Sequence, residues 1–220
     1  MGILLIDKPK GITSHDVIYK LRKITGIKKI GHAGTLDPNA SGLLIVAITR
    51  EFTKKLGDLS KKTKKQYIAE LTLGEERDTH DIEGKVTNTS NNVPDIHTIK
   101  NILSNFEGKI SQIPPKHSAI KINGKKAYDL ARSSKEFELK PREVTIYTIK
   151  IIDFTYPILK LEIDCSSGTY IRALARDIGR DIGSFAYLSN LRRTMIGDYS
   201  VSNAHKLDTI NADNWQDKEV

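Results

Sequence analysis

The chain has 220 residues and a formal net charge of +8 at neutral pH, from 35 lysines and arginines against 27 aspartates and glutamates. Hydrophobic residues make up 38% and charged residues 28%, which is typical of a soluble globular protein and excludes a fibrous or a disordered chain. The longest apolar run, residues 43–48, is far shorter than the roughly 20 residues of a membrane-spanning helix, so we expect no membrane span.

The basic charge favours a polyanionic partner, nucleic acid before an acidic membrane surface, although a protein can also be basic without such a partner. The single cysteine, Cys165, excludes an intramolecular disulfide and a multi-cysteine metal site. The N-terminal residues lack the pattern of a secretion signal, and we therefore expect a cytoplasmic protein. Six lysines gather at Lys54, Lys55, Lys61, Lys62, Lys64 and Lys65.

The first quarter of the chain is predicted to form two strands and two helices. A helix begins at an N-cap, Thr13 or Ser14, and ends at Gly26, because apolar residues recur between them at helical spacing. Before this helix the pattern predicts a short buried strand over residues 2–6 and a turn over 7–11. After it come a glycine-rich segment over 31–42, a buried strand over 43–48 and a helix over 50–59 that Thr49 caps.

The middle of the chain begins with a strand over residues 66–73, where Tyr67, Ala69, Leu71 and Leu73 share one face. A polar loop over residues 74–94 follows. Asp95 is then predicted to cap a helix whose apolar face holds Ile96, Ile99, Ile102, Leu103 and Phe106. After Pro114-Pro115, the lysine-rich residues 116–142 are predicted to project from the fold, with a small helix near 126–132.

The last third is predicted to contain two strands, over residues 144–152 and 159–165, and a helix that carries Ile171, Leu174, Ala175 and Ile178. A short helix near residues 185–190 is expected to lead into Leu191-Arg192-Arg193. Strands and helices are mixed without a regular alternation, and this predicts an α+β fold with a mixed sheet.

Several common chemistries are excluded by the sequence. The six histidines show no zinc-ligand spacing, and neither a phosphate-binding P-loop nor a dinucleotide-binding fingerprint is present. No nucleophile elbow of the GxSxG type occurs either. The sequence therefore predicts neither a metal ion nor a nucleotide cofactor.

Asp37 is a candidate functional carboxylate, because glycines surround it and Pro38 follows it directly. Gly34 and Gly42 permit unusual backbone angles, and Pro38 keeps Asp37 out of the helical region, so the carboxylate is expected to be held in a defined loop. Functional groups are often presented on such loops. The alternative is an Asx-turn, in which Asp37 only bonds nearby backbone amides.

A second candidate is the junction from strand to helix at residues 165–172, which carries Tyr170 and Arg172. A helix start can hold an anion, but Tyr170 could equally pack in the core and Arg172 face solvent. Tyr67 on its own strand and Leu191 before the arginine pair could likewise be ordinary core residues. The pair itself could meet phosphates or solvent.

Seven segments, in their order along the chain, resemble the TruB family of tRNA pseudouridine synthases. The resemblance covers roughly residues 2–207, and the segments around Asp37 and Arg172 are highly specific in combination. The segments are Asp7-Lys8-Pro9 with Gly11, Gly31-His32-Ala33-Gly34-Thr35-Leu36-Asp37-Pro38, Tyr67 with Leu73-Gly74, Asp78-Thr79-His80-Asp81 to Gly84, Pro114-Pro115 with Ser118-Ala119, Gly168-Thr169-Tyr170-Ile171-Arg172, and Leu191-Arg192-Arg193.

The resemblance implies that the protein isomerises a uridine in the T-loop of tRNA to pseudouridine, without a cofactor or a metal. By the family pattern, Asp37 is the nucleophile and Arg172 forms an ion pair with it. Tyr67 lies against the target base and serves in proton transfer, and Tyr170 and Leu191 line the pocket. His32 is expected to contact the RNA and to support the flipped nucleotides.

The resemblance also implies an overall organisation. The fold is expected to be that of the pseudouridine synthases, with a mostly antiparallel sheet and flanking helices. Residues 1–207 would form the catalytic domain, residues 116–142 a thumb-like insertion that clamps the RNA, and residues 208–220 a short tail. Many relatives carry a C-terminal PUA-type RNA-binding domain, which we do not expect here, and we expect a monomer. His117 departs from the family pattern, where a hydrophobic residue or tyrosine is usual.

A non-catalytic RNA chaperone or binding module is the competing hypothesis, based on the basic charge and the thumb-like insertion. A pure binder does not need the combination of Asp37 and Arg172, and this combination favours the enzyme. A plain scaffold protein has little support in the sequence.

Overall fold

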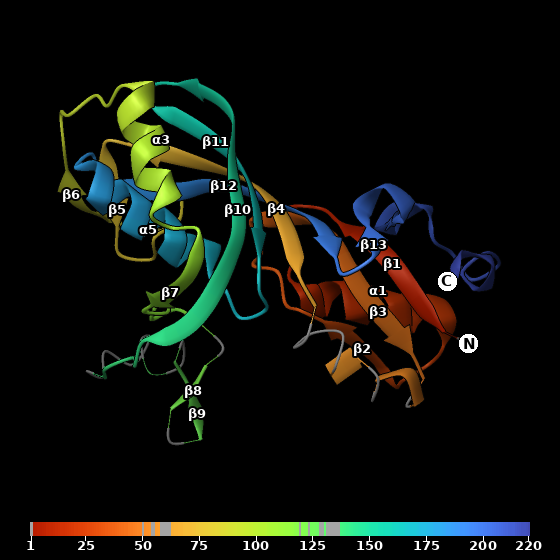
Figure 1. Cartoon of the computed structure of the whole chain (residues 1–220). Helices are drawn as coiled ribbons and strands as arrows, with labels where there is room; N and C mark the ends of the chain where they lie inside the picture. Colours follow the sequence, from red (N-terminus) through yellow and green to blue (C-terminus); the bar gives the residue numbers. More distant parts are fainter. Residues whose placement is uncertain are drawn as a thin grey trace. The chain divides into compact units, whose positions relative to one another are not determined.

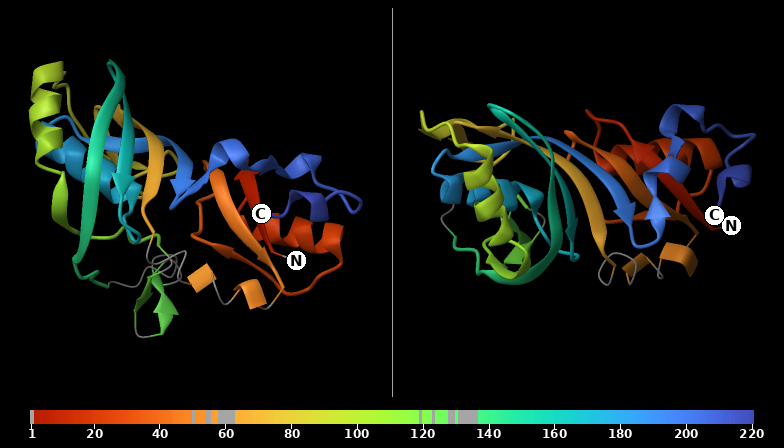
Figure 2. Two further views of the ribbon diagram at one scale, coloured as in Figure 1. Left: turned by 45° about the vertical axis from the view of Figure 1, so that its right-hand side comes forward. Right: turned by 45° about the horizontal axis from the view of Figure 1, so that its top comes forward.

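The computed structural model describes residues 2–49, 51–53, 56–57, 63–118, 120–122, 124–127, 130 and 137–220. The chain divides into two compact units, Met1–Ile68 with Asn190–Val220, and Ala69–Ser189. Two strands belong to both units, β4 (Lys65–Leu73) and β12 (Ala186–Ile196), and they are neighbours in the sheet (Figures 1 and 2). The fold is α+β, as predicted.

The first unit is built around β3 (Ala40–Ile48), whose residues are almost all buried. Both β1 (Ile3–Lys8) and β2 (Ile30–Ala33) pair with β3 antiparallel, and β12 pairs with it in parallel. Two short strands extend this sheet: β14 (His205–Lys206) lies parallel to β1, and β13 (Tyr199–Ser200) lies antiparallel to β12. The sheet is therefore mixed, as the sequence predicts.

Both faces of β3 are covered, which explains its continuous apolar run. On one face, Leu44, Val46 and Ile48 pack with helix α1 (Ser14–Thr25), which Figure 1 shows alongside β1 and β3. On the other face, Leu43, Ile45 and Ala47 pack with Leu5, Ala33, Leu56 and Ile196. A strand that is buried on both faces loses the alternation of polar and apolar residues.

Helix α1 has the boundaries that the sequence predicts. Thr13 caps it in a capping box, in which the Thr13 hydroxyl accepts from the Asp16 amide and the Asp16 carboxylate accepts from the Thr13 amide. Gly26 ends the helix in the left-handed conformation, and its amide donates to the Arg22 carbonyl.

In the second unit the strands of the sheet follow the order β12, β4, β11, β10, β7. Of these, β12 and β4 are the two strands that also belong to the first unit. Strand β10 (Arg142–Thr155) pairs antiparallel with both β11 (Ile158–Cys165) and β7 (Gly108–Gln112). Buried and exposed residues alternate in β4 and β11 as predicted.

Two helices of the second unit pack against each other, α3 (Ile96–Ser104) and α5 (Ile171–Ile182), on one side of the long β10–β11 hairpin (Figure 1). Asp95 caps α3 as predicted, through side-chain bonds from the His97 and Thr98 amides. Ile171, Leu174, Ala175 and Ile178 of α5 are all buried. None of the described helices is long and apolar enough to cross a membrane.

The helix predicted near residues 185–190 is wrong, because this segment belongs to strand β12. Its residues Ala186, Tyr187 and Leu188 are buried one after another, and the strand lies between β3 and β4 in the sheet. Pairing on both edges outweighs the weak helical preference of so short a segment.

Besides β2, β7, β13 and β14, four further short strands were not predicted. The segment 74–94 is not only a loop, since β5 (Glu75–Arg77) and β6 (Val86–Thr89) form a small antiparallel sheet in it. Within the segment 116–142, β8 (Lys121–Ile122) pairs with β9 (Lys125–Lys126).

The two remaining predicted helices fall partly on residues outside the description. Residues 51–53 and 56–57 of the helix predicted over 50–59 are helical, whereas residues 50, 54, 55, 58 and 59 lie outside the described residues. Ala127 and Leu130 of the helix predicted near 126–132 are helical, and Lys126 belongs to β9. Residues 128, 129, 131 and 132 lie outside the described residues, as do four of the six clustered lysines, Lys54, Lys55, Lys61 and Lys62.

The segment predicted as a short tail, residues 208–220, packs on the first unit. Ile210 and Trp215 are buried with Leu207 in the same core as α1. Short 3-10 helices occur at Val201–Asn203, Leu207–Thr209 and Gln216–Lys218. A catalytic domain with its boundary at residue 207 remains a prediction.

Candidate active site

Asp37 is exposed on the loop between β2, which ends at Ala33, and β3, which begins at Ala40. Its neighbour Leu36 is only 4% exposed, and this buried side chain anchors the loop in the core. The Ala40 amide donates to the Asp37 carbonyl at 3.1 Å and closes a turn over Pro38. The loop thus presents the exposed residue Asp37 from a backbone that is fixed on both sides.

Ser14, at the start of α1, fastens the loop to the helix. Its side chain is completely buried, accepts a hydrogen bond from the Leu36 amide at 3.0 Å and donates one to the Leu36 carbonyl at 3.1 Å. One hydroxyl therefore satisfies both backbone groups of the residue directly before Asp37, which no local sequence pattern indicates.

Lys8 supports the loop from the other side. It is completely buried, and its ammonium donates to the carbonyls of Pro9, Ile12 and Pro38 at 2.8, 2.7 and 3.3 Å. The pKa of Lys8 is lowered to about 8, chiefly by burial; the negative Asp37 opposes this shift and the positive Arg193 contributes to it. A buried cation next to the nucleophile candidate thus remains mostly charged at neutral pH.

His32 lies on β2, and its ring meets that of His15 edge to face at a centroid distance of 5.6 Å. Burial lowers the pKa of His32, and His15 and Arg193 add to this effect, so the imidazole is neutral at neutral pH. Its Nδ1 is buried without a hydrogen-bond partner among the described residues. A neutral ring with an unused polar atom is suited to stacking or hydrogen bonding with a nucleotide.

Tyr67 and Leu191 lie on adjacent strands of the same unit as Asp37. Tyr67 is 7% exposed on β4, and Leu191 is on β12, directly opposite Ala40 of β3. Ala40 follows Asp37 by three residues, so the strand register brings Leu191 to the end of the Asp37 loop.

Tyr170 and Arg172 belong to the second unit, at the start of α5. Tyr170 is the N-cap residue of α5, and both of its backbone groups bond to one side chain: its amide donates to Gln112 Oε1 at 2.9 Å and its carbonyl accepts from Gln112 Nε2 at 3.2 Å. Gln112, on β7, is 1% exposed. This pair of hydrogen bonds fixes the backbone of Tyr170, and no local sequence pattern indicates it.

Arg172 is buried, and its guanidinium bonds to three residues of its own unit. It donates to the Asp81 carboxylate at 3.1 Å and to the carbonyls of His117 and Thr79 at 2.8 and 3.4 Å. The His117 contact uses a carbonyl, which any residue type offers at that position. Asp37, the partner expected from the family resemblance, belongs to the other unit, and this pairing remains a prediction.

Four charged residues of the second unit, Glu76, Arg172, Arg176 and Arg180, act on the imidazole of His80. Arg180 forms two hydrogen bonds with the Glu76 carboxylate, at 2.6 and 2.8 Å, and these lower the pKa of Glu76. Burial lowers the pKa of His80 to about 4, and the nearby Arg176 adds to this shift. The described residues contain no group of three or more histidine, cysteine, aspartate and glutamate side chains that could hold a metal ion.

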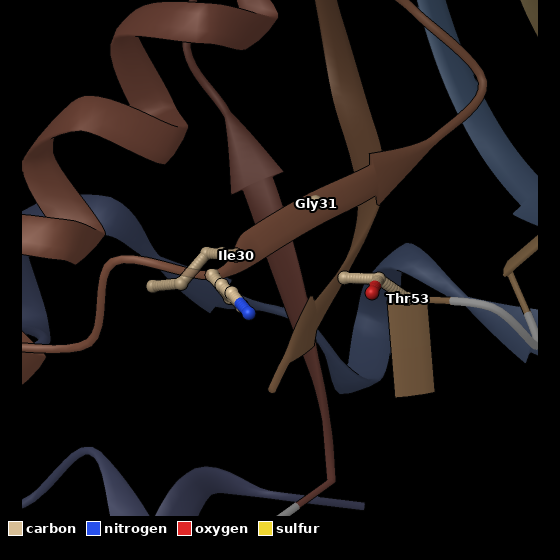
Figure 3. A pocket seen from close by; sticks show the side chains of 4 residues that line it. Ile30, Gly31 and Thr53 are labelled. Carbon is tan, nitrogen blue, oxygen red and sulfur yellow. The ribbon is translucent and has the colours of Figure 1, made fainter. Parts of the chain in front are cut away.

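A surface pocket elsewhere in the first unit is lined by Lys29, Ile30, Gly31 and Thr53. Figure 3 shows the side chains of Ile30 and Thr53 beside Gly31 on β2. None of the predicted site residues lines this pocket, and we assign it no role.

The family described as TruB family pseudouridylate synthase (N terminal domain) matches residues 22–171 of the chain. A protein named tRNA pseudouridine synthase B from Protochlamydia amoebophila is 47% identical over 202 residues, which cover 92% of this chain and 76% of the relative. A protein of the same name from Clostridium acetobutylicum is 43% identical over 213 residues, with 97% and 73% covered.

Two solved structures share the fold of this chain. The first is a Cbf5–Nop10–Gar1 complex, with 30% identity and a TM-score of 0.72 over 94% of this chain. The second is an H/ACA ribonucleoprotein bound to a substrate RNA containing 2′-deoxyuridine, with 27% identity and a TM-score of 0.71 over 98% of this chain. The chain spans 52% and 55% of these two solved chains.

The family match, the named relatives and the fold therefore define a pseudouridylate synthase. The chain belongs to the TruB family.

Proposed function

We propose that this protein isomerises a uridine in the T-loop of tRNA to pseudouridine and that Asp37 is the nucleophile. The observation that supports this most directly is the exposed Asp37 carboxylate on a loop anchored by Ser14 and Lys8. The close relatives are named for the same activity on tRNA.

The reaction breaks the bond between N1 of the base and C1′ of ribose and forms a bond between C5 and C1′. Uracil is a poor leaving group, and a covalent step by the Asp37 carboxylate divides one difficult step into two easier ones. The attack falls on C1′ or on C6 of the base. The bond to the Asp37 carboxylate breaks again, the proton on C5 leaves to solvent through a base, for which Tyr67 is the candidate, and N1 takes up a proton in exchange. No electrons are gained or lost overall.

Arg172 and Tyr170 complete the proposed set from the second unit. Arg172 would keep Asp37 ionised, because a nearby cation favours the charged form of a carboxyl group, and its planar guanidinium would fix the direction of the carboxylate. Asp81 already orients this guanidinium within its own unit. Tyr170 and Leu191 would line the pocket for the base.

The target base has to leave its stack before it can react, which costs a few kcal/mol. We propose that stacking against Tyr67 and contacts from His32 offset this cost. The T-arm would be recognised mainly by its shape and phosphates, with residues 116–142 as a clamp. We further propose that the protein acts as a monomer in the cytoplasm, without a metal ion or a cofactor.

Tritium release from a T-arm stem-loop labelled at C5 of uridine tests the function. We expect release with the wild-type protein and none with Asp37→Asn, because an amide is a far weaker nucleophile than a carboxylate. RNA binding should remain within about threefold, since the substitution changes little in shape. Asp213→Asn removes another exposed aspartate of the same unit and serves as the control that keeps its activity.

Two outcomes contradict the proposal. If the wild-type protein binds the RNA without releasing tritium, it is not a synthase for this uridine, and an RNA-binding module becomes the better explanation. If Asp37→Asn unfolds the protein, the Asp37 carboxylate serves the structure of the loop instead. RNA refolding that survives Asp37→Asn would reveal a second activity beside catalysis.

A further inference from the structure

Arg193 is an almost completely buried arginine next to the Asp37 loop. It lies on β12, pairs with Gly42 of β3 and is 1% exposed, and it is among the largest fully buried side chains of the described residues. From the sequence, Arg193 was expected to face either phosphates or solvent. Its burial inside the first unit therefore calls for another explanation.

The guanidinium of Arg193 bonds to both ends of the segment that carries Asp37. Its Nη2 donates to the Gly34 carbonyl at 2.7 Å and its Nε donates to the Leu43 carbonyl at 2.8 Å. Gly34 precedes Asp37 by three residues and Leu43 follows it by six. One planar group thus ties the beginning of the loop to the strand that follows it, as a guanidinium with several fixed donors can do.

The glycines of the loop fit closely around this arginine. Gly34 has φ +69°, and a side chain there would begin 3.1 Å from Arg193 Nη1. Gly42 has φ +101°, and a side chain there would collide with the Arg193 backbone. The glycine-rich pattern therefore allows the loop to close directly onto Arg193.

No described residue forms an ion pair with Arg193, whereas Arg192 beside it is paired with Asp7. Burying a charge without a counter-charge is costly, and Arg193 also lowers the pKa of both Lys8 and His32. An apolar side chain of the same size would fill this space with less loss of free energy. The bonds to Gly34 and Leu43 are what such a side chain could not provide.

We propose that Arg193 is a positioning residue that holds the loop of residues 34–43 and thereby aims the Asp37 carboxylate. The inference rests on the proposed function and assigns Arg193 no contact with the substrate. A nucleophile displaced by about 1 Å can lose two orders of magnitude in rate, so a clamp on its backbone acts on the chemical step rather than on RNA binding.

The test compares Arg193→Met and Arg193→Lys with the wild-type protein in single-turnover tritium release at saturating T-arm RNA. Methionine removes both bonds, and we expect a rate about 100-fold lower. Lysine keeps the charge but cannot span both carbonyls, and we expect a partial rescue, to a rate about tenfold below wild type. Arg22→Met removes another arginine that donates to a carbonyl of the same unit, that of Ile30 at 3.4 Å, and should keep the wild-type rate.

Two further measurements separate positioning from general damage. RNA affinity should stay within about threefold of wild type in both Arg193 variants, because only the chemical step is affected. Amide hydrogen exchange should accelerate within residues 34–43 and not in the rest of the first unit.

The inference is overturned if folded Arg193→Met reacts at the wild-type rate, if only its RNA affinity falls, or if exchange accelerates evenly throughout the unit. If Arg193→Met does not fold, Arg193→Lys decides, and a wild-type rate with unchanged exchange overturns the inference. A wild-type protein that releases no tritium contradicts the proposed function instead, while the exchange of residues 34–43 still tests the clamp.

Discussion

Asp37 is exposed, but the groups that hold its loop are buried. Ser14 and Lys8 are completely inaccessible and Arg193 is nearly so, and each bonds to a backbone carbonyl of the loop or its edges. Functional side chains need their geometry fixed within fractions of an ångström, and buried polar contacts provide such precision better than exposed ones. Substitutions of these buried residues are therefore expected to affect catalysis almost as strongly as substitutions of exposed residues next to Asp37.

His80 makes the stability of the second unit depend on pH. Burial lowers its folded pKa to about 4, from 6.5. Between these values the unfolded chain binds a proton that the folded chain does not, so the free energy of unfolding falls as the pH drops from 6.5 to 4, by at most about 1.4 kcal/mol per pH unit.

Replacing His80 with asparagine should flatten this part of the pH profile, measured by urea unfolding from pH 7 to 4. Asparagine tolerates the left-handed backbone at this position, where φ is 60°. His97→Asn on the exposed side of α3 is the matched control and should keep the wild-type slope. Identical slopes for His80→Asn and the wild-type protein would contradict the assignment.

The sequence predicted the position of Asp37 better than its surroundings. Glycines and Pro38 mark the loop locally, and they can be recognised without any structure. Ser14 and Arg193 contact this loop from sequence distances of 22 and 159 residues. Gln112 and Tyr170 are 58 residues apart, and Asp81 and Arg172 are 91. Such partners are brought together by the tertiary packing of strands, helices and loops, which local patterns do not encode.

At the scale of elements, two neighbouring residues at the start of α1 have different roles, one in the stability of the helix and one in holding the Asp37 loop. Thr13 is exposed and caps the helix, whereas its neighbour Ser14 is buried and bonds to the Asp37 loop. Thr13→Ala should reduce the free energy of unfolding by about 1 kcal/mol through the lost cap, with an unchanged turnover rate per folded molecule. Urea unfolding and single-turnover tritium release measure the two effects.

Ser14→Ala should reduce both quantities, because it leaves the Leu36 amide and carbonyl without their partner. An unsatisfied buried group costs about 1–3 kcal/mol, and a loosened loop should also slow the reaction. Equal turnover rates for the two variants would show that the bond from Ser14 to Leu36 does not control Asp37.

Elements with a strong local signal were predicted well. Alternation in β4 and β11, the Asp95 cap of α3 and the apolar face of α5 are all confirmed. The exception was β12, which was assigned to a helix over part of its length. Its burial pattern has no regular alternation, and its two ends belong to different units, so no local period identifies it.

At the scale of the whole molecule, the charge of +8 predicts that RNA binding depends on salt. If four or more lysines and arginines contact phosphates, the logarithm of affinity should fall against the logarithm of salt concentration with a slope of about −3 or steeper. Fluorescence anisotropy with a labelled T-arm and Asp37→Asn protein measures this slope without turnover. A flat dependence would contradict recognition through phosphates.

The two ends of the chain are held together in the first unit. Figure 2 shows the N and C labels close together. The Gly2 amide donates to Glu219 Oε1 at 2.8 Å, and the Val220 amide donates to the Ile3 carbonyl at 2.9 Å. A short peptide linker could therefore close the backbone into a ring without moving any strand. In the chain-entropy description, such closure restricts the unfolded ensemble and adds on the order of 5 kcal/mol to stability. The same proximity would let new termini be opened in an exposed turn, giving a circular permutant whose Asp37 loop is unchanged.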